Sequence, residues 1–326
     1  GTFDFDTPNF YTKFMRGKLL YFVTTDKPDD FLYIYSAEGR SVYEQVLNLN
    51  CNETKQLLQA VAYNMQEDNR FYKYDFLFDN CTTRIRDIVL KSNKNISVTE
   101  NIVPPGTTFR DMIHYYLDRG SQPWSKLGMD ILLGIKTDKP VTNSQAMFLP
   151  EYFMKGLNMA DNKKPVVKQT IPLLPAQPKQ EAKRIYTPLI GTGIICVVIF
   201  LISLSSANWA KTFTGIADAL LFYITGLLGL LILFMWFGTD HIACSNNFNI
   251  AWALPTNFIA AFFLGKKPLW VKNYFTIAAI INAILLVAFF WLPQSLNVAV
   301  APVILLMLNR YLNLSMQIRM RGQKFK

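Results

Sequence analysis

Histidines, clustered cysteines and C-terminal acidic residues are all scarce in this 326-residue chain. It has only two histidines, and its four cysteines form no CxxC pair and no Cys/His ligand cluster. This composition argues against a structural zinc site, and we expect no metal or cofactor. The chain begins at Gly1 without an initiator methionine or a signal peptide, so we expect residues upstream of it.

Acidic residues are rarest in the C-terminal half. Residues 188–326 contain two acids, Asp218 and Asp240, against nine lysines and arginines, and consist mostly of apolar runs. Such runs indicate a membrane protein, and membrane topology accounts for much of the net charge of +10. No groove-like pattern of basic and aromatic residues appears, so nucleic acid is not an expected partner.

Five apolar runs approach the length of a membrane span. They cover residues 189–206, 216–237, 248–264, 274–292 and 298–314. We interpret the third as a helix kinked at Pro255, and we expect Arg310 in the fifth to extend toward the cytoplasmic interface.

Basic residues in alternate loops set the expected topology. Lys211 follows the first run, three lysines (Lys266, Lys267 and Lys272) follow the third, and Arg319, Arg321, Lys324 and Lys326 follow the fifth. The loops 239–247 and 293–297 carry none. By the positive-inside rule, the N-terminal domain lies outside and the C-terminus is cytoplasmic.

The N-terminal residues 1–160 have the pattern of a soluble α+β domain. We predict about three strands within 3–35, including the aromatic run 31–35, and further strands over 41–49 and 71–78. Helices are predicted after an N-cap at Asn52, with an apolar stripe over 57–65, and then over 107–117, 124–133 and 152–159. The Pro-rich, basic residues 161–187 are interpreted as a linker to the transmembrane domain 188–326, with contact to anionic headgroups as the alternative.

Cys81 is the candidate nucleophile. It follows the polar pair Asp79-Asn80, between the predicted strand 71–78 and apolar residues at helical spacing over 85–89. At a helix N-terminus, unpaired backbone N–H groups and the helix dipole stabilise a thiolate, which can act as a nucleophile. The alternatives are a small core residue or half of a disulfide.

The other cysteines leave this choice open. Cys51 would share an oxidising compartment and could pair with Cys81 or Cys244, and the first pairing would remove the nucleophile. Cys196 lies inside an apolar run, where inert packing is expected.

Few residues could support a cysteine nucleophile. His114 lies in a predicted helix, where a surface or packed histidine is the simpler interpretation, and His241 follows Asp240, which could orient it. Arg84 and Arg86 could hold a lipid phosphate, or they could pair with acids of the domain.

The segment 74–84, Tyr-Asp-Phe-Leu-Phe-Asp-Asn-Cys-Thr-Thr-Arg, resembles the cysteine motif of Lnb-type lipoprotein N-acyltransferases of Bacteroides-like bacteria. The runs 127–134 and 148–152 fit the same periplasmic domain, and the spans with Thr239-Asp240-His241 fit its membrane part. The resemblance covers nearly the whole chain. It implies a papain-like or permuted α+β cysteine domain followed by a bundle of about five transmembrane helices.

The resemblance also implies a function in the bacterial inner membrane, with the N-terminal domain in the periplasm. An acyl chain would pass from a phospholipid to Cys81 as a thioester, and then to the α-amine of a diacylglyceryl-cysteine lipoprotein. On this reading Asn80 and Thr82 shape the turn or the oxyanion site, and the candidate substrate-binding residues are Arg84, Arg86 and Asp240.

One feature departs from the family pattern. The family carries its catalytic histidine in a Gly-His-Ser-like segment upstream of the cysteine, and residues 1–80 contain no histidine. We expect that histidine before Gly1, with His241 as the base otherwise. Two other functions stay open: a membrane-tethered papain-like cysteine hydrolase of peptidoglycan or peptide amides, and a non-catalytic membrane assembly protein.

Overall fold

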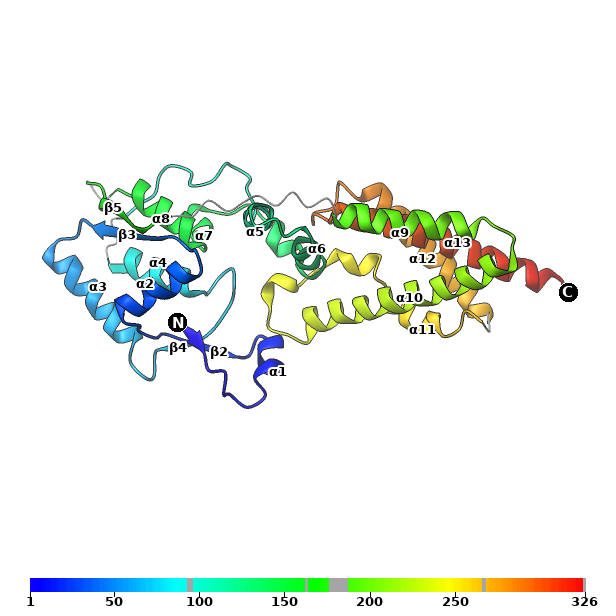
Figure 1. The fold of residues 1–326 in the computed structure, drawn as a ribbon, viewed down its shortest axis with the longest axis horizontal. Coiled ribbons are helices and arrows are strands. Elements are labelled where there is room, and N and C mark those ends of the chain that lie inside the picture. Colours follow the sequence, from blue (N-terminus) through cyan, green and yellow to red (C-terminus); the bar gives the residue numbers. More distant parts are fainter. Residues whose placement is uncertain (93–95, 162–163, 176–186, 266–267, 325–326) are drawn as a thin grey trace. The chain divides into compact units, whose positions relative to one another are not determined.

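The computed structural model describes residues 1–92, 96–161, 164–175, 187–265 and 268–324 (Figure 1). Lys266, Lys267, Lys326 and much of the predicted linker lie outside the described residues. The chain divides into an N-terminal unit, residues 1–112 and 139–181, and a C-terminal unit, residues 113–138 and 182–326. Residues 113–138, which the sequence placed in the soluble domain, therefore fold with the C-terminal unit.

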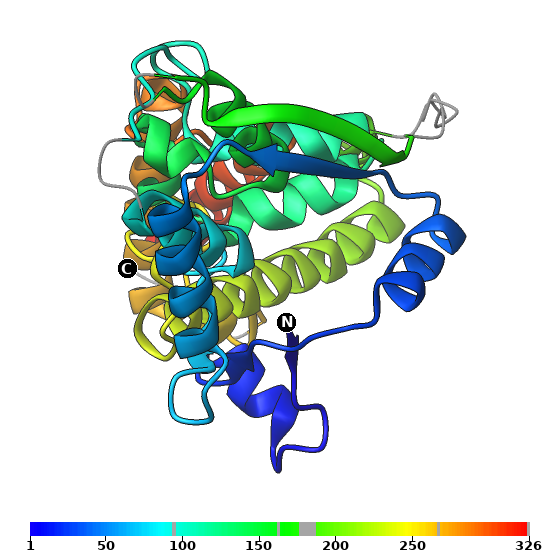
Figure 2. The same ribbon diagram turned by 90° about the vertical axis from the view of Figure 1, so that its left-hand side faces the viewer.

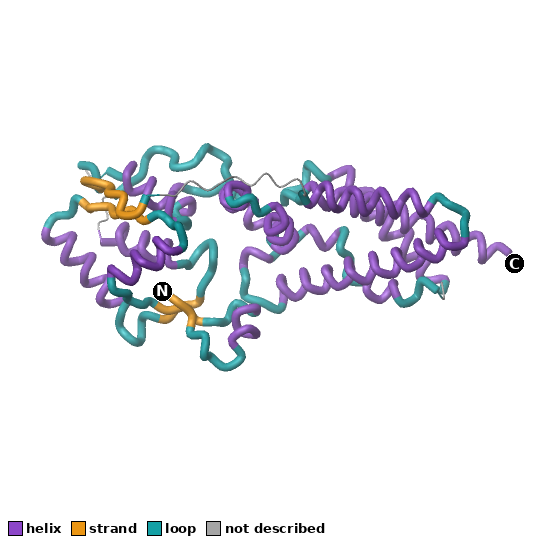
Figure 3. Tube along the Cα trace, in the orientation of Figure 1, coloured by secondary structure: helices purple, strands orange, loops and turns teal. Residues whose placement is uncertain are grey.

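The N-terminal unit is an α+β domain with two small antiparallel sheets, as Figures 2 and 3 show. One sheet has the order β1 (Thr2–Phe3), β2 (Leu20–Phe22) and β4 (Phe71–Lys73). The other pairs β3 (Val42–Leu47) with β5 (Val167–Leu174), so part of the predicted linker is a strand of this unit. Its helices are α1 (Phe10–Met15), α2 (Pro28–Ala37), α3 (Cys51–Asn64), α4 (Cys81–Ser92), α7 (Asn143–Ala146) and α8 (Pro150–Met159), and α5 (Phe109–Arg119) crosses the unit boundary.

The prediction of a strand over residues 31–35 is wrong, because these residues lie within the helix α2. Pro28 occupies the first turn, where its missing N–H costs nothing, and Asp29 and Asp30 favour the positive end of the helix dipole. The rings of Phe31 and Tyr35, one helical turn apart, lie 4.4 Å from each other. The aromatic spacing here therefore reflects side chains four residues apart on one face of a helix, not the alternation of a strand.

The helix predicted after Asn52 begins two residues earlier. Asn50 is the N-cap of α3, and its side chain accepts from the backbone N–H of Glu53 while Glu53 accepts from that of Asn50. No residue of α3 is buried, and Leu58, in the predicted apolar stripe, is 63% exposed.

Four apolar helices dominate the C-terminal unit. Three are long enough to cross a bilayer among the described residues: α10 (Asn208–Phe237), α12 (Leu269–Ala288) and α13 (Ala301–Lys324). The fourth, α9 (Pro188–Ser203), is apolar but has only 16 residues. The single helix predicted over 248–264 is wrong, because this stretch holds the 3-10 turn η3 (Phe248–Ala251) and the five-residue α11 (Asn257–Ala261).

Two glycines of α10 explain how residues 248–264 pack. A Cβ at Gly226 of α10 would overlap the backbone of Phe258, and one at Gly229 would overlap that of Ala253. The stretch therefore lies directly against α10. Asn257 then accepts hydrogen bonds from the hydroxyls of Tyr274 (2.6 Å) and Tyr311 (2.7 Å), which join α11 to α12 and α13.

A buried ion pair also links the helices. Arg310 of α13 donates two hydrogen bonds, of 2.7 and 2.9 Å, to the carboxylate of Asp218 in α10, and both side chains are buried. The predicted extension of Arg310 to the interface is therefore wrong. Pairing with a carboxylate is the other way in which an apolar environment tolerates a guanidinium.

The helix α6 (Pro123–Leu132) and the 3-10 turn η1 (Ile135–Asp138) are held to this unit by buried amides. Asn247 donates to the carbonyls of Ile131 and Leu132, and Gln294 donates to that of Leu133. These bonds satisfy carbonyls that the end of a helix leaves without intrahelical partners.

We predict that Gly226→Ala destabilises the protein by about 1–3 kcal/mol, because the added methyl overlaps a backbone that cannot move without breaking the α10–α11 contact. The matched control is Gly215→Ala on the same helix, where a Cβ meets nothing within 4 Å. There, alanine is expected to be neutral or to stabilise by up to ~1 kcal/mol. Thermal unfolding in detergent compares the two, and equal midpoints would contradict the packing described.

Candidate active site

The turn before Cys81 is built by Asp75. Its carboxylate accepts the backbone N–H groups of Leu77 (2.9 Å) and Phe78 (3.0 Å), and a bridge between Asp75 and Asp79 closes the loop. The strand β4 accordingly ends at Lys73, earlier than predicted. The helix α4 begins at Cys81, which confirms the predicted position of the cysteine at a helix N-terminus.

Asn80 is the structural centre of this turn. Its side-chain oxygen accepts from the N–H of Thr83 (2.8 Å), and the Thr83 hydroxyl accepts from the N–H of Asn80 (2.8 Å). Its amide nitrogen donates to the carbonyls of Phe76 (2.8 Å) and Phe148 (2.9 Å). With this amide fully used and only 4% of the residue exposed, the geometry supports a role for Asn80 in the turn rather than as an oxyanion donor. Thr82 is buried, and Thr83, which the sequence reasoning missed, completes the cap.

Three tyrosines surround the Cys81 side of the turn. Tyr21 of β2 faces Tyr72 of β4 in register, and its ring lies 5.6 Å from that of Tyr72 and 5.2 Å from that of Tyr74. Burial, and after it the nearby negative charge of a Cys81 thiolate, raise the pKa of Tyr74 to about 12. The pKa values of Tyr21 and Tyr72 are raised by the same two causes. At neutral pH all three hydroxyls stay protonated, and the Tyr21 hydroxyl donates to the carbonyl of Gly1 at 2.6 Å. The hydroxyls of Tyr72 and Tyr74 are the neutral donors that could serve the exposed thiol.

The two arginines of α4 are engaged within the protein. Arg84 makes two hydrogen bonds to Asp79, of 2.6 and 2.8 Å, and its guanidinium lies 3.9 Å from the centre of the Tyr72 ring. Hydrogen bonding to Asp79 raises the pKa of Arg84. Arg86 bonds Asp87 and the carbonyl of Ser144. This favours the alternative in which both arginines pair with acids of the domain instead of holding a phosphate.

His241 and Asp240 lie in the C-terminal unit, directly after α10. Asp240 is exposed, and the half-buried His241 precedes the 3-10 turn η2 (Ile242–Cys244). The structure thus brings Asn80, Thr82, Arg84 and Arg86 together with Cys81, whereas His241 and Asp240 belong to the other unit.

A second histidine arrangement was not expected from the sequence. His114 of α5 makes a 2.7 Å contact from Nε2 to Oδ1 of Asp130 in α6, and the Nδ2 of Asn297 donates to Oδ2 of the same carboxylate at 2.8 Å. The Asp130 side chain is only 2% exposed, whereas that of His114 is 23% exposed. A buried carboxylate that orients a partly exposed imidazole is the arrangement used by histidine general bases.

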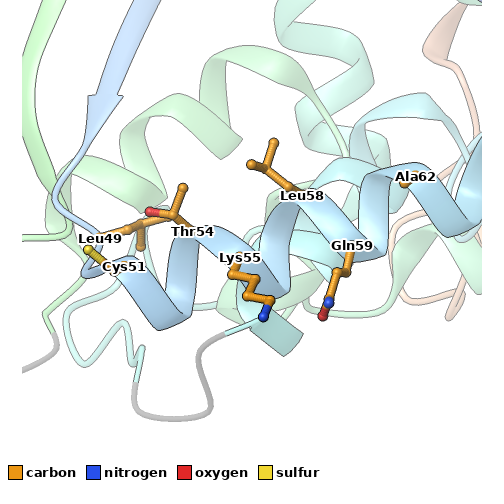
Figure 4. A pocket seen from close by; sticks show the side chains of 7 residues that line it. All are labelled: Leu49, Cys51, Thr54, Lys55, Leu58, Gln59 and Ala62. Atoms are coloured by element: carbon orange, nitrogen blue, oxygen red, sulfur yellow. The ribbon is translucent and has the colours of Figure 1, made fainter.

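Neither of two surface hollows in the N-terminal unit is lined by Cys81. One follows α3, where Figure 4 shows Cys51 in the first turn beside Leu49. The other lies between α3 and α4 and is lined by polar residues that include Asp79 and Arg84.

All four cysteines lie among the described residues, and none of them forms a disulfide there. The pairings considered for Cys51 are therefore absent from this structure. Cys51 and Cys81 are exposed, whereas Cys196 and Cys244 are buried.

Two family models match the chain in order. The model of the Lnb N-terminal periplasmic domain matches residues 3–115, and that of the Lnb transmembrane domain matches residues 180–321. The chain is an Lnb-type protein. No curated protein and no solved structure matched it.

This Lnb-type protein is thus a membrane protein with a periplasmic N-terminal domain, and its family indicates a part in lipoprotein processing. Cys81 and His114 both fall within the stretch that matches the periplasmic domain, although His114 and Asp130 belong to the C-terminal unit. The apolar helices α9, α10, α12 and α13 fall within the stretch that matches the transmembrane domain.

We predict that a thiol reagent labels Cys51 and Cys81 of the folded, non-reduced Lnb-type protein and leaves Cys196 and Cys244 unmodified, because only the first two are exposed. Peptide mass spectrometry locates the label, and the unfolded chain, in which all four should react, is the control. A Cys81 that reacts only after reduction would indicate a disulfide and would support the assembly-protein interpretation.

Proposed function

We propose that this Lnb-type protein is a lipoprotein N-acyltransferase that carries its acyl intermediate on Cys81. The observation that carries the proposal is the exposed, free thiol of Cys81 at the N-terminus of α4. It belongs to a periplasmic domain of a chain that also has membrane-spanning helices, where a phospholipid is the abundant acyl donor.

In the first step, the Cys81 thiolate attacks an ester carbonyl of a phospholipid. The new C–S bond forms and the ester C–O bond breaks, and the departing glycerol oxygen takes up a proton to give a lysophospholipid. Negative charge develops on the carbonyl oxygen. We assign its stabilisation to the backbone N–H groups of Cys81 and Thr82 in the first turn of α4, together with the hydroxyls of Tyr72 and Tyr74.

In the second step, the α-amine of a diacylglyceryl-cysteine attacks the thioester. A C–N bond forms, the C–S bond breaks and the Cys81 thiolate is regenerated. The amine must lose a proton to a general base, and the chain's two histidines, His114 and His241, both of the C-terminal unit, are the candidates. In the tautomer that donates Nε2–H to Asp130, Nδ1 is the atom of His114 that can accept a proton. His241, which follows Asp240, is the other candidate.

The membrane arrangement follows from the alternating basic residues. We propose that the protein lies in the bacterial inner membrane with its C-terminus in the cytoplasm. This requires an odd number of crossings, and it is met by α9, α10, α12 and α13 with the broken stretch 248–264 as a fifth crossing.

The test is intact mass after reconstitution with a phospholipid. We expect one added acyl chain that hydroxylamine removes, and mass spectrometry should place it on Cys81. The variant Cys81→Ala is expected to lose both the acyl adduct and lipoprotein N-acylation. The matched control is Cys51→Ala, which removes the other exposed thiol and should keep both.

Two results would contradict the proposal. N-acylation that persists in Cys81→Ala would exclude a thioester on this residue. A wild-type protein that cleaves peptidoglycan peptides and never acquires an acyl group would favour the cysteine hydrolase instead.

We predict that removing the acting histidine, tested as His114→Gln and as His241→Gln, still allows the Cys81 thioester to form but slows acyl transfer to the amine by about 10²–10⁴-fold, because a positioned base contributes about that factor. Added imidazole should partly restore the rate of the corresponding alanine variant, which a purely structural histidine would not allow. Single-turnover mass spectrometry separates the two steps. Loss of transfer in His241→Gln with normal transfer in His114→Gln would assign the base to His241.

A further inference from the structure

The first segment of the N-terminal unit exposes a cluster of large apolar side chains. No residue of the short helix α1 is buried. Tyr11 is 84% exposed and Phe5 is 70% exposed, and Phe14 and Met15 are about half exposed. In water such side chains gain little from their position, so a soluble domain has no evident reason to gather them in one segment.

This cluster is continuous with the surroundings of Cys81. The ring of Phe3 lies 5.7 Å from that of Phe14 and 6.3 Å from that of Phe10. It also lies 4.8 Å from the ring of Tyr21 and 5.9 Å from that of Tyr74, two of the tyrosines that respond to the charge of Cys81. An unbroken series of aromatic contacts therefore leads from α1 to Tyr21 and Tyr74, whose pKa values the charge of Cys81 raises.

Basic side chains accompany the exposed aromatic ones. Lys13, Arg16 and Lys18 lie in or directly after α1, and all three are exposed. Two acids, Asp4 and Asp6, precede α1, and the carboxylate of Asp4 accepts hydrogen bonds from the N–H of Asp6 and the hydroxyl of Thr7 within its own turn. Aromatic residues mixed with lysine and arginine are typical of protein surfaces that enter the boundary between lipid headgroups and acyl chains.

We propose that the α1 surface, made of Phe5, Tyr11, Phe14 and Met15 with Lys13, Arg16 and Lys18, inserts into the phospholipid surface of the bilayer. The aromatic side chains lie at the depth of the ester groups, and the cations contact the headgroup phosphates. The part of this inference that concerns acyl delivery rests on the proposed function: the series through Phe3 guides a donor ester toward Cys81. The contact with lipid does not depend on it.

The first experiment measures lipid contact without using enzyme activity. Tyr11 is replaced by the photocrosslinker p-benzoylphenylalanine in the full chain, reconstituted in nanodiscs of phosphatidylethanolamine and phosphatidylglycerol. After irradiation, we expect the mass of a phospholipid on the peptide that contains position 11. The matched control is the same replacement at Tyr33 of α2, which is 75% exposed and lies outside the α1 surface.

A lipid adduct at position 11 and none at position 33 supports the inference. An adduct at position 11 with protein instead of lipid would assign the surface to a partner protein or a second copy, and no adduct, or equal adducts at both positions, would also overturn it.

The second experiment tests delivery to Cys81. The double variant Tyr11→Ser/Phe14→Ser is expected to form the thioester at least about tenfold more slowly from bilayer phospholipid. The reason is that two aromatic side chains no longer insert into the lipid. With a water-soluble short-chain phospholipid it should react at the wild-type rate, which shows that the variant is folded. Tyr33→Ser is the control for a lost exposed tyrosine.

Equal slowing with both donors would overturn the delivery role. If no variant and no wild-type protein forms a thioester with either donor, the proposed function fails, whereas a lipid adduct at position 11 would still support contact with the bilayer.

Discussion

The position of Cys81, the candidate nucleophile, depends on the buried amide of Asn80. This one side chain caps α4, closes the turn back to Phe76 and reaches the carbonyl of Phe148 in another part of the unit. A buried amide that lost these partners would leave carbonyls unsatisfied at a cost of about 1–3 kcal/mol. Cys81 follows directly, so its exposure at the first turn of α4 results from a neighbour that cannot move. These hydrogen bonds hold the turn that presents the thiol.

Buried polar groups play a comparable part in the C-terminal unit. Apolar helices pack against one another and against lipid with similar energy, so apolar contacts alone do not specify their neighbours. The Asp218–Arg310 pair joins α10 to α13, and Asn257 joins α11 to the tyrosines of α12 and α13. Asp130 extends the same principle to His114, which gives an ordered imidazole in a chain with few histidines.

Local signals explain which elements could be predicted. The strand β3, the helix start at Cys81 and the helices α5, α6 and α8 have clear breaks or apolar spacing, and the structure contains them. The prediction failed where the same residues fit both the two-residue period of a strand and the 3.6-residue period of a helix, as in the aromatic run of α2. The run 248–264 is apolar enough for a helix, but contacts at Gly226 and Gly229 of a distant segment accompany its breakage. The residues of the run cannot reveal such a contact, because periodicity reports only on neighbours within the same segment.

The sequence by itself determined the membrane character of the chain, the α+β class of its N-terminal domain, its family and the helix-terminal position of Cys81. Each of these depends on composition or on residues close together in the chain. Only the tertiary structure decided that Arg310 is paired, that Arg84 is engaged by Asp79, that His114 is oriented by Asp130 and Asn297, and that the tyrosines of two strands meet beside Cys81. Most of these contacts join residues far apart in the sequence, so their geometry exists only once the chain has folded.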